Sequence, residues 1–589
     1  MEATREIYWN IGHGAVIPMY LLVTIASGIM LWGFWQRVAI WRQGKALNRF
    51  DRYDERVKRM IEEVFGQEKV ARVKSGGLFH TLFFWGFLTL FVGTLLVMLQ
   101  ADYLTPLVHF NLLSGPFYQA FSLVLDLAGL VAIVMLGGLF VRRFVIRPEG
   151  LETTDDDYRI HILLFAILIT GFLIEGSRMA ATELLQNPSL ALYSPVGLLV
   201  AKAMGGFSSA GLRSVHMGLW WFHLVLVLGF IAALPYTKLR HIVLTSANAF
   251  FAPLEPKGTI ATTNLEDESI EQFGVAKVSD GTWKDIFDAD ACLTCKRCQD
   301  VCPASATDKP LSPMKLIRQI GETAQDAPEA SLVEVISPDA LWACTTCRAC
   351  QDICPANIEH VNKIIELRRN MTLMEGAFPG DEVRTAVSNT EVNGNPFGLA
   401  YAARGDWAEG LNVTLMESGA EVDILYFVGC YASFDNRNRQ VARSFITICN
   451  ASGIKVGILG KEEKCCGEPL RKLGNEYLYQ MTATENIELI KGYGVKRIVT
   501  TCPHCFNTLG RDYKDLGLDL PVEHYSTFVS SLISDGRLKL KQDLEPFKAT
   551  YHDSCYLGRY MDIIDQPRSI LKAAGGVITE MDKSGYDSF

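Results

Sequence analysis

Fifteen cysteines offer the clearest chemistry in this 589-residue sequence, and all of them lie between residues 292 and 555. A disulfide scaffold is typical of short secreted domains, whereas clustered cysteines in a long chain are typical of metal ligands. We therefore expect a reducing compartment. The net charge of −9 gives no basic surface for nucleic acid. Disordered, fibrous and simple soluble hydrolase classes are also disfavoured.

Two runs of four cysteines share one spacing, and each run ends in proline. They comprise Cys292, Cys295, Cys298 and Cys302, and then Cys344, Cys347, Cys350 and Cys354. This spacing is that of bacterial two-cluster ferredoxins, in which the fourth cysteine ligates the other cluster. We expect Cys354 to complete the first [4Fe–4S] cluster and Cys302 to complete the second. A Cys₄ zinc site is the alternative, although such sites favour paired C-x-x-C units.

Further cysteines follow predicted buried strands, which alternate with helical stretches from about residue 422. The predicted strands are 422–429, 455–460, 496–501 and 547–551, and the cysteines after them are Cys430, Cys465 with Cys466, Cys502 with Cys505, and Cys555. Apolar strands that alternate with helices predict a parallel sheet, and ligands gather at the carboxyl ends of its strands. Cys449 falls inside a predicted helix and is interpreted as a core residue.

The first half of the chain has the composition of a membrane domain. The whole chain is 49% hydrophobic and 21% charged, which indicates a part-membrane, part-soluble protein. Five segments approach the length of about 20 apolar residues that a spanning helix needs. They are 15–35, 77–100, 117–141, 160–175 and 219–235. We interpret the apolar stretch 189–206 as re-entrant or interfacial, because a sixth span would break the loop charge pattern.

Basic residues in the loops orient these spans. Eleven Lys and Arg lie between the first and second spans, and none lies between the second and third. The positive-inside rule then puts the N-terminus outside and everything after residue 239 in the cytoplasm. We expect a multi-pass protein of a prokaryotic inner membrane, embedded in lipid, with its iron–sulfur domains in the cytoplasm.

Histidines inside spans are costly and usually functional. His80 begins the second predicted span, and His223 and His241 lie in and just after the fifth. The last two share one helical face but stand about 27 Å apart along it, so they cannot ligate one iron. Two histidines at two depths suit two stacked b haems. Local hydrogen bonds or a quinone pocket are the alternative.

The stretch from His223 to His241 resembles the fifth helix of the nitrate reductase gamma-subunit family of di-haem cytochromes b, as Leu78-Phe79-His80 resembles its second. This resemblance implies that His80 and His241 ligate an inner haem and that His223 serves an outer one. The usual partner of His223 is replaced by Leu90. The candidate substitutes are His13, His109 and His216, unless the outer haem is absent.

A quinone site needs a route for protons, and carboxylates inside spans are candidates for it. Asp126 lies inside the third predicted span, Glu175 ends the fourth, and Arg178 lies just beyond. The alternative for Asp126 is a hydrogen bond to a neighbouring helix.

The later cysteines resemble those of the Cys-Cys-Gly domain of heterodisulfide reductase catalytic subunits. The matching residues are Cys430, Cys465, Cys466, Cys502 and Cys505. The resemblance implies one noncubane [4Fe–4S] cluster on these five thiolates, with a cubane on four of them or zinc as the alternative. Cys555 resembles the opening cysteine of a second copy, whose cysteine pair would fall one residue past Phe589. We therefore expect no second noncubane cluster.

The whole architecture resembles membrane-bound iron–sulfur oxidoreductases proposed to link electron-transfer flavoprotein to menaquinone. The expected fold is multi-domain: an all-α bundle of five spans, an α-helical two-[4Fe–4S] ferredoxin-like module, and an α/β Cys-Cys-Gly domain with a parallel sheet. The expected boundaries are 1–245 for the cytochrome b-like domain, 246–285 for a linker, 286–375 for the ferredoxin-like module, 376–420 for a connecting segment, and 421–589 for the Cys-Cys-Gly domain with an incomplete second repeat.

This resemblance implies a membrane electron-transfer oxidoreductase with electron-transfer flavoprotein as partner and the quinone pool as acceptor. Its cofactors would be two cubane [4Fe–4S] clusters, one noncubane [4Fe–4S] cluster, one or two haems b, and menaquinone. A quinol-dependent disulfide reductase is one alternative, and an electron-relay subunit of a larger complex is another. A homo-oligomer is compatible with all three.

Overall fold

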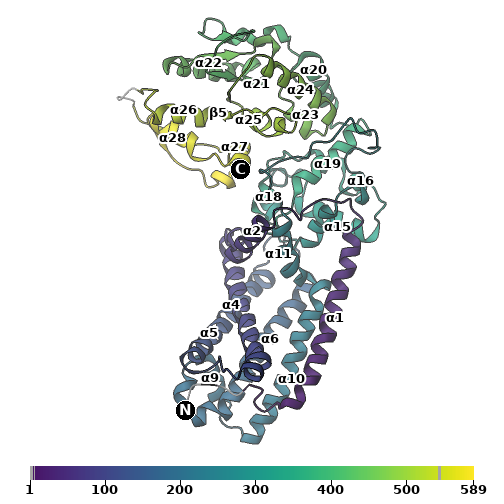
Figure 1. Cartoon of the computed structure of the whole chain (residues 1–589), viewed down its shortest axis with the longest axis vertical. Coiled ribbons are helices and arrows are strands. Elements are labelled where there is room, and N and C mark those ends of the chain that lie inside the picture. Colours follow the sequence, from purple (N-terminus) through teal and green to yellow (C-terminus); the bar gives the residue numbers. More distant parts are fainter. Residues whose placement is uncertain (1–3, 5–6, 541–544, 589) are drawn as a thin grey trace. The chain divides into compact units, whose positions relative to one another are not determined.

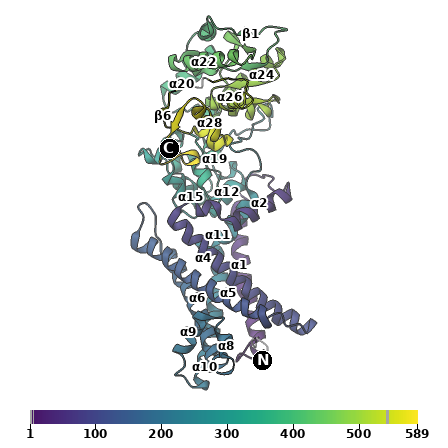
Figure 2. The same ribbon diagram turned by 90° about the vertical axis from the view of Figure 1, so that its left-hand side faces the viewer.

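The computed structural model describes residues 4, 7–540 and 545–588. The chain divides into two compact units. The first comprises Met1–Arg42, Phe50–Phe251 and Asp290–Cys295, and the second comprises Gln43–Arg49, Ala252–Ala289 and Lys296–Phe589. Long helices dominate the first unit, whereas shorter helices and all of the paired strands make up the second (Figures 1 and 2).

Five helical segments of the first unit are long and apolar enough to cross a membrane, as the sequence predicts. They are Val16–Trp41, Lys74–Val108, Gly115–Ile146, Asp155–Gln186 and Ser209–Tyr236. Their α-helical parts are α1 (Val16–Trp41), α4 (Lys74–Leu99), α5 (Gly115–Phe140), α6 (Asp155–Ala181) and α10 (Ser209–Ala233). The second and third segments end in π-helical turns, Gln100–Val108 and Val141–Ile146.

The fourth segment is longer than the predicted interval 160–175. Glu175 and Arg178 therefore lie inside α6 and not at or beyond its end. Arg178 is buried there and is paired with Glu183 at 2.5 Å, so its charge is compensated within the bundle.

The stretch 189–206 does not form a sixth span. It contains α8 (Pro188–Ala191) and α9 (Pro195–Ala203), and nine residues of α9 are too few to cross a membrane. Each helix has proline at its first position, where proline favours a new helix start. The other short elements of this unit are a 3-10 turn (His13–Ala15), α2 (Tyr53–Gly66), α3 (Glu68–Ala71), α7 (Glu183–Gln186), 3-10 turns at Leu234–Tyr236 and Lys238–Arg240, and α11 (His241–Phe251).

The ferredoxin-like region is α-helical, as expected. Its helices are α12 (Trp283–Ala291), α13 (Arg297–Asp300), α14 (Pro303–Ala306), α15 (Pro313–Asp326), α16 (Leu332–Ile336), α17 (Pro338–Trp342), α18 (Ala349–Ile353) and α19 (His360–Leu373), followed by α20 (Asp381–Asn393). The start of α15 illustrates the local sequence signals: Ser312 caps it by accepting from the backbone N–H of Lys315, and Pro313 follows at the first helical position.

The Cys-Cys-Gly domain contains the predicted parallel sheet. Its strands are β1 (Thr414–Leu415), β2 (Ile424–Tyr426), β3 (Val456–Ile458), β4 (Ile498–Thr500) and β5 (Val522–His524), in the order β1-β3-β2-β4-β5. The helices between and around them are α21 (Gly429–Phe434), α22 (Asn436–Ala451), α23 (Glu468–Lys472), α24 (Glu476–Gly492), α25 (Pro503–Gly510) and α26 (Tyr525–Ser534).

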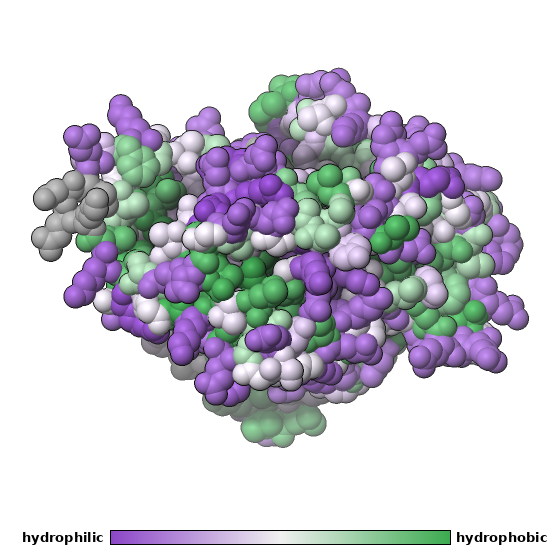
Figure 3. All heavy atoms as spheres, turned by 90° about the horizontal axis from the view of Figure 1, so that it is seen from above, coloured by the Kyte–Doolittle hydropathy of each residue, from purple (hydrophilic) through white to green (hydrophobic). Residues whose placement is uncertain are grey.

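Two apolar clusters form the core of this domain. One contains Leu425 and Phe427 of the β2 region, and the other contains Ile424, Tyr426 and the buried thiol of Cys449. The interpretation of Cys449 as a core residue is therefore confirmed. Figure 3 shows the molecule from above, with hydrophilic side chains over much of that face and hydrophobic ones gathered between them.

The predicted strand 547–551 does not join this sheet, so that part of the prediction is wrong. The strand there is β6 (Phe547–Ala549), and it pairs in parallel with β7 (Gly576–Ile578) as a separate two-stranded sheet. The position beside β4 is taken by β5, whose Val522 is paired with Ile498. Two helices, α27 (Cys555–Met561) and α28 (Asp565–Ala573), lie between β6 and β7 in the chain.

Candidate metal centres

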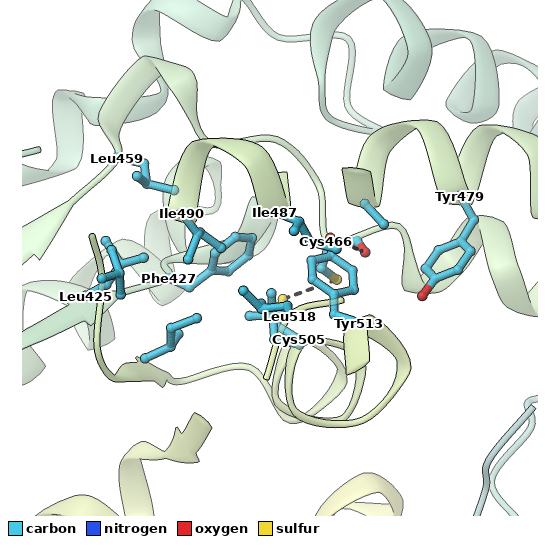
Figure 4. Packing of buried hydrophobic residues seen from close by; sticks show 14 of the residues in the cluster. Leu425, Phe427, Leu459, Cys466, Tyr479, Ile487, Ile490, Cys505, Tyr513 and Leu518 are labelled. Atoms are coloured by element: carbon cyan, nitrogen blue, oxygen red, sulfur yellow. Dashed lines mark hydrogen bonds between the residues drawn. The ribbon is translucent and has the colours of Figure 1, made fainter. Parts of the chain in front are cut away.

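Five cysteines meet at the carboxyl ends of three neighbouring strands in the Cys-Cys-Gly domain. Cys430 lies at the start of α21 after β2, the Cys465–Cys466 pair follows β3 through a 3-10 turn, and Cys502 follows β4. Because β3, β2 and β4 are adjacent and parallel, these loops lie at one edge of the sheet. The Sγ atoms of Cys466 and Cys505 are 3.4 Å apart (Figure 4).

The five thiols of this group lie close together in the interior. Four of its cysteines are buried and Cys502 is half-buried. Hydrogen bonds from the thiols of Cys465 and Cys505 lower the pKa of Cys466 to about 7. The Tyr513 hydroxyl donates to the Cys466 carbonyl at 3.0 Å, which fixes the loop. The lowered pKa makes Cys466 more readily available as the thiolate that binds metal, whereas the neighbouring thiols and burial raise the pKa of Cys430 and Cys505.

A buried ion pair supports the loop that carries Cys430. Arg404 donates to Glu463 Oε1 at 2.7 Å, and both of its Nη atoms lie 3.7 Å from Cys430 Sγ. Glu463 also accepts from the backbone N–H groups of Val428 and Gly429 at 2.9 and 2.8 Å. Arg404 therefore brings a positive charge to a cysteine that would carry negative charge. Sequence reasoning missed this pair, because Arg404 lies outside the cysteine pattern and Glu463 sits in an ordinary charged stretch.

The two four-cysteine runs have loops shaped for an anionic group. Thr294 and Lys296 in the first run have φ values of 50° and 69°, and Thr346 and Arg348 in the second have 56° and 62°. Alternation of right- and left-handed residues turns successive backbone N–H groups toward one point, an arrangement found at many iron–sulfur sites. The Thr346 N–H donates to Cys344 Sγ at 3.3 Å. The residues present therefore fit iron–sulfur clusters.

Packing also brings parts of the two runs together. Cys298 and Cys350 belong to one apolar cluster with Ile260, Met314, Val361 and Ile365. Cys295 is exposed, Cys292 and Cys344 are half-buried, and the other cysteines of the runs are buried. In the described part of the chain, no three His, Cys, Asp or Glu side chains converge on a position for a single metal ion. A four-iron cluster is larger than one ion, so its ligands stand farther apart.

His80 and His241 face each other in the membrane unit. Their ring centres are 6.3 Å apart. Imidazole nitrogens lie about 2 Å from a bound metal, so two rings on opposite sides of one ion have centres roughly 6 Å apart. His241 Nδ1 is 2.7 Å from the Lys238 carbonyl, which can only accept, so Nδ1 carries the proton and Nε2 is the nitrogen that could bind a metal. Burial lowers the pKa of His241, which favours the neutral ligand form.

The outer histidine, His223, has a different environment. Its Nδ1 lies 2.8 Å from Thr170 Oγ1 of α6. His216 is buried on α10 and its ring lies 4.8 Å from that of Trp9, but it is two helical turns from His223, about 10 Å along the helix. These two residues therefore do not flank one iron. His109 is exposed at the end of a π-helical turn, and the side chain of His13 lies outside the described part.

The three quinone candidates lie around the short helices between α6 and α10. Both Asp126 carboxylate oxygens accept from the backbone N–H groups of Val196 and Gly197, at 2.9 and 2.8 Å. Asp126 thus caps α9, which favours the hydrogen-bonding interpretation. Glu175 accepts from Ser194 at 3.0 Å, and Arg178 pairs with Glu183.

Comparisons with known proteins match both cysteine regions. Residues 284–355 match the family described as 4Fe-4S dicluster domain, and residues 424–510 match the family described as cysteine-rich domain. No solved structure matches.

Two relatives are similar over nearly the whole chain. EtfAB:quinone oxidoreductase of Syntrophomonas wolfei is 36% identical over 619 residues, which cover 97% of this chain and 85% of that protein. The probable iron-sulfur-binding oxidoreductase FadF of Bacillus subtilis is 32% identical, with 96% and 86% covered. One polypeptide of the dihydromethanophenazine:CoB–CoM heterodisulfide reductase of Methanosarcina mazei is 30% identical over 51% of this chain and 76% of its own length.

Proposed function

This chain belongs to the family of membrane-bound iron–sulfur oxidoreductases that includes EtfAB:quinone oxidoreductase, and we propose that it carries electrons from an electron-transfer flavoprotein to menaquinone. The observation that carries the proposal is the similarity to that relative over 97% of the chain, which includes both the membrane helices and the cysteine sites. Iron–sulfur clusters and haem b supply one-electron carriers when they are bound.

The Cys-Cys-Gly domain is the proposed entry for electrons. Cys430 is buried, but its neighbour Tyr431 is 62% exposed and packs on Phe397 with ring centres 5.1 Å apart. The group of five cysteines therefore lies just beneath the surface, within reach of a partner protein. Arg404 and Glu463 keep the Cys430 loop fixed while the charge of the site changes.

The proposed ligand sets follow the two-cluster spacing. Cys430, Cys465, Cys466, Cys502 and Cys505 would hold a noncubane [4Fe–4S] cluster. Cys344, Cys347, Cys350 and Cys302 would hold one cubane, and Cys292, Cys295, Cys298 and Cys354 would hold the other.

Within the membrane unit, the start of the first run is anchored near the proposed inner haem. Asp290 accepts from Trp41 Nε1 at 2.7 Å and pairs with Arg37 at 3.4 Å. The Asp290 carbonyl accepts from Arg240, the residue next to the proposed haem ligand His241, at 3.2 Å. These contacts support transfer between the first cysteine run and a haem held by His80 and His241. We propose His223 as a ligand of an outer haem.

We propose cytoplasmic iron–sulfur domains and a quinone site in which Glu175 and Arg178 take part. Asp126 is the weaker candidate, because its oxygens are already occupied by backbone N–H groups. If quinone is reduced near the outer face, each electron crosses the membrane. A potential of 100 mV is then worth about 2.3 kcal/mol per charge, which helps an uphill transfer.

The direct test follows the α-band of haem b. Anaerobic oxidised protein is mixed with chemically reduced electron-transfer flavoprotein from the same source, and a menaquinone analogue is then added. We expect haem reduction within seconds of mixing and reoxidation by the quinone analogue. His241→Leu serves as the matched variant and should abolish the inner-haem signal while the iron content of the clusters is retained.

A disulfide reductase is the second candidate, and the similarity to the heterodisulfide reductase polypeptide favours it. It predicts no reduction by the flavoprotein and rapid haem oxidation by a heterodisulfide after quinol reduction. That outcome would contradict the flavoprotein-to-quinone direction.

A further inference from the structure

Helix α27 lies between the second four-cysteine run and the Cys-Cys-Gly site, and none of the ligand sets above uses it. We propose that Tyr556 of this helix is a positioning residue: it fixes the distance between the two cluster-binding loops, so that one electron passes directly from one cluster to the other. This inference deepens the proposed function and rests on it, because both loops must hold clusters.

One side of α27 contacts the loop of the second run. The Tyr556 hydroxyl lies 3.1 Å from Thr346 Oγ1, and the Tyr560 hydroxyl donates to the Thr346 carbonyl at 2.5 Å. Arg559 Nε donates to the Cys347 carbonyl at 2.8 Å. Since Thr346 lies between two ligand cysteines in a left-handed conformation, these bonds hold the part of the loop that faces the cluster.

The same Tyr556 side chain contacts both halves of the Cys-Cys-Gly site. Its hydroxyl donates at 2.7 Å to Oε1 of Glu468, the residue that follows Cys465-Cys466-Gly467. Its ring centre lies 4.1 Å from that of His504, which stands between Cys502 and Cys505. Tyr556 is thus in contact with the ligand loops of both proposed clusters.

The surroundings of Tyr556 are buried and closely packed. Tyr556 and Tyr560 are 1% and 0% exposed, and their rings stack with centres 4.2 Å apart at an interplanar angle of 8°. The Lys472 ammonium lies 5.8 and 5.5 Å from these rings, and burial lowers the pKa of Lys472. If both loops hold clusters, the transfer would move one electron between them, and no bond would form or break.

A second set of hydrogen bonds, which does not involve α27, connects the second cysteine run to the Cys-Cys-Gly site. Arg368 donates to the Cys344 carbonyl at 2.6 Å and to the Lys472 carbonyl at 3.0 Å. Because Arg368 remains in a Tyr556 variant, we expect the loops to stay together but with a wider spread of separations. The effect sought is therefore one of position and not of unfolding.

The test uses the full-length, cluster-loaded protein with three variants. Tyr556→Leu removes the ring and the hydroxyl, and Tyr556→Phe removes the hydroxyl alone. Tyr513→Phe is the control, because it deletes a hydroxyl that contacts Cys466 but has no described hydrogen bond to the second run. Iron content and thermal unfolding establish that each variant is folded and loaded.

Two measurements read the position of the clusters. Pulsed electron paramagnetic resonance gives the magnetic coupling between the two reduced clusters, and flash photoreduction gives the rate of electron transfer between them. We expect weaker, broader coupling and a slower rate in Tyr556→Leu, because the rate of electron tunnelling falls as the distance between the two centres grows. Tyr556→Phe should lie between Tyr556→Leu and the unaltered protein, and Tyr513→Phe should keep the unaltered coupling.

Unchanged coupling and rate in a fully loaded Tyr556→Leu protein would overturn the proposal. Equal losses in Tyr556→Leu and Tyr513→Phe would also overturn it, because they would show general loosening of the domain. A different result would contradict the proposed function. In that case the unaltered protein would show the coupling between the clusters but would not be reduced by the flavoprotein.

Discussion

The first four-cysteine run, from Cys292, and the second, from Cys344, place left-handed residues at matching positions but have different neighbours. The start of the first run, at Asp290, is bound by Trp41 and Arg37 within the membrane unit. The second is bound by side chains that lie beside or beyond the Cys-Cys-Gly site, including Arg559 on the Cys347 carbonyl.

The different neighbours show how two loops with the same backbone conformation can serve different roles. The spacing of the cysteines and the backbone turns equip each loop for the same kind of cluster. The hydrogen bonds then differ between the two runs: Asp290, just before the first run, is bound by residues of the membrane helices, and the second run is bound by residues of the Cys-Cys-Gly region.

The largest effects should come from removing one cysteine ligand from each run, which tests whether the two runs differ in their place along the proposed electron path. In Cys350→Ser the flavoprotein should still reduce the Cys-Cys-Gly site but no longer the haem, because the second cluster is lost. In Cys298→Ser we expect the second cluster and the Cys-Cys-Gly site both to be reduced while the haem stays oxidised. Rapid-freeze electron paramagnetic resonance distinguishes the two, and identical spectra would contradict the proposed order.

Asp288 joins the segments that flank both runs, and its substitution should weaken both equally. It accepts from Lys284 at 2.6 Å, from Lys363 at 2.5 Å and from the Glu359 N–H at 3.0 Å. In Asp288→Asn the Lys284 ammonium keeps Glu359 at 3.2 Å and the Lys363 ammonium keeps Asp285 at 3.0 Å. We therefore expect a loss of about 1.5–3 kcal/mol in the free energy of unfolding, the contribution of a hydrogen bond to a charged group. Denaturant titration followed by cluster absorbance measures it.

The pH dependence of Asp288 sharpens this prediction. Burial alone would raise the pKa of Asp288, but the ammonium groups of Lys284 and Lys363 lower it below its usual value. The stabilisation is therefore fully present above the unfolded pKa of about 4 and is lost as the pH falls below it. Acid should narrow the stability gap between the natural protein and Asp288→Asn; a gap that widens below about pH 4 would contradict the assignment.

Asp290→Asn should affect the first run alone. The variant weakens the bond from Trp41 and the pairing with Arg37, and hydrogen bonds to charged groups contribute about 1.5–3 kcal/mol each. We expect slower haem reduction while the coupling between the second cluster and the Cys-Cys-Gly site stays unchanged. Iron content measured by mass spectrometry shows whether the first cluster is retained. A change in the spectrum of the second cluster would contradict the prediction that Asp290 acts on the first run alone.

The smallest expected effect comes from the left-handed positions themselves. Lys296→Gly relieves an unfavourable φ but loses the surface ion pair with Asp300 at 3.0 Å, so the net change should be within about 1 kcal/mol. Arg348→Gly should cost more, because Arg348 also donates to Gln351 at 2.8 Å and lies over the Tyr560 ring at 5.2 Å. The midpoint temperature at which cluster absorbance is lost on heating is compared for the two variants. Equal midpoints would show that the neighbours of Lys296 and Arg348 do not affect stability.

Local signals in the sequence predict much of this molecule. The cysteine spacing predicts the iron–sulfur region, and the apolar stretches predict five spans. The alternation of strands and helices predicts where Cys430, Cys466 and Cys502 lie at the sheet edge. These features depend on residues close together in the sequence, so the sequence alone predicts them.

Features that depend on distant packing could not be predicted. The pair of β6 with β7, the placement of Arg404 beside Cys430, and the contact of Tyr556 with Thr346 each join residues that no periodicity connects. The capping of α9 by Asp126 was foreseen only as an unspecified hydrogen bond to a neighbouring helix.

The arrangement of ligands on β2, β3 and β4 has a consequence for biogenesis. On the proposed ligand sets, a ribosome completes the cubane ligands at Cys354 but completes the last noncubane ligand only at Cys505. At about 5–20 residues per second, this delay is on the order of ten seconds. During part of that time the thiols from Cys430 onward are already synthesised, but the sheet that buries them has not yet formed. We therefore expect iron insertion into this domain to be the oxygen-sensitive step of maturation.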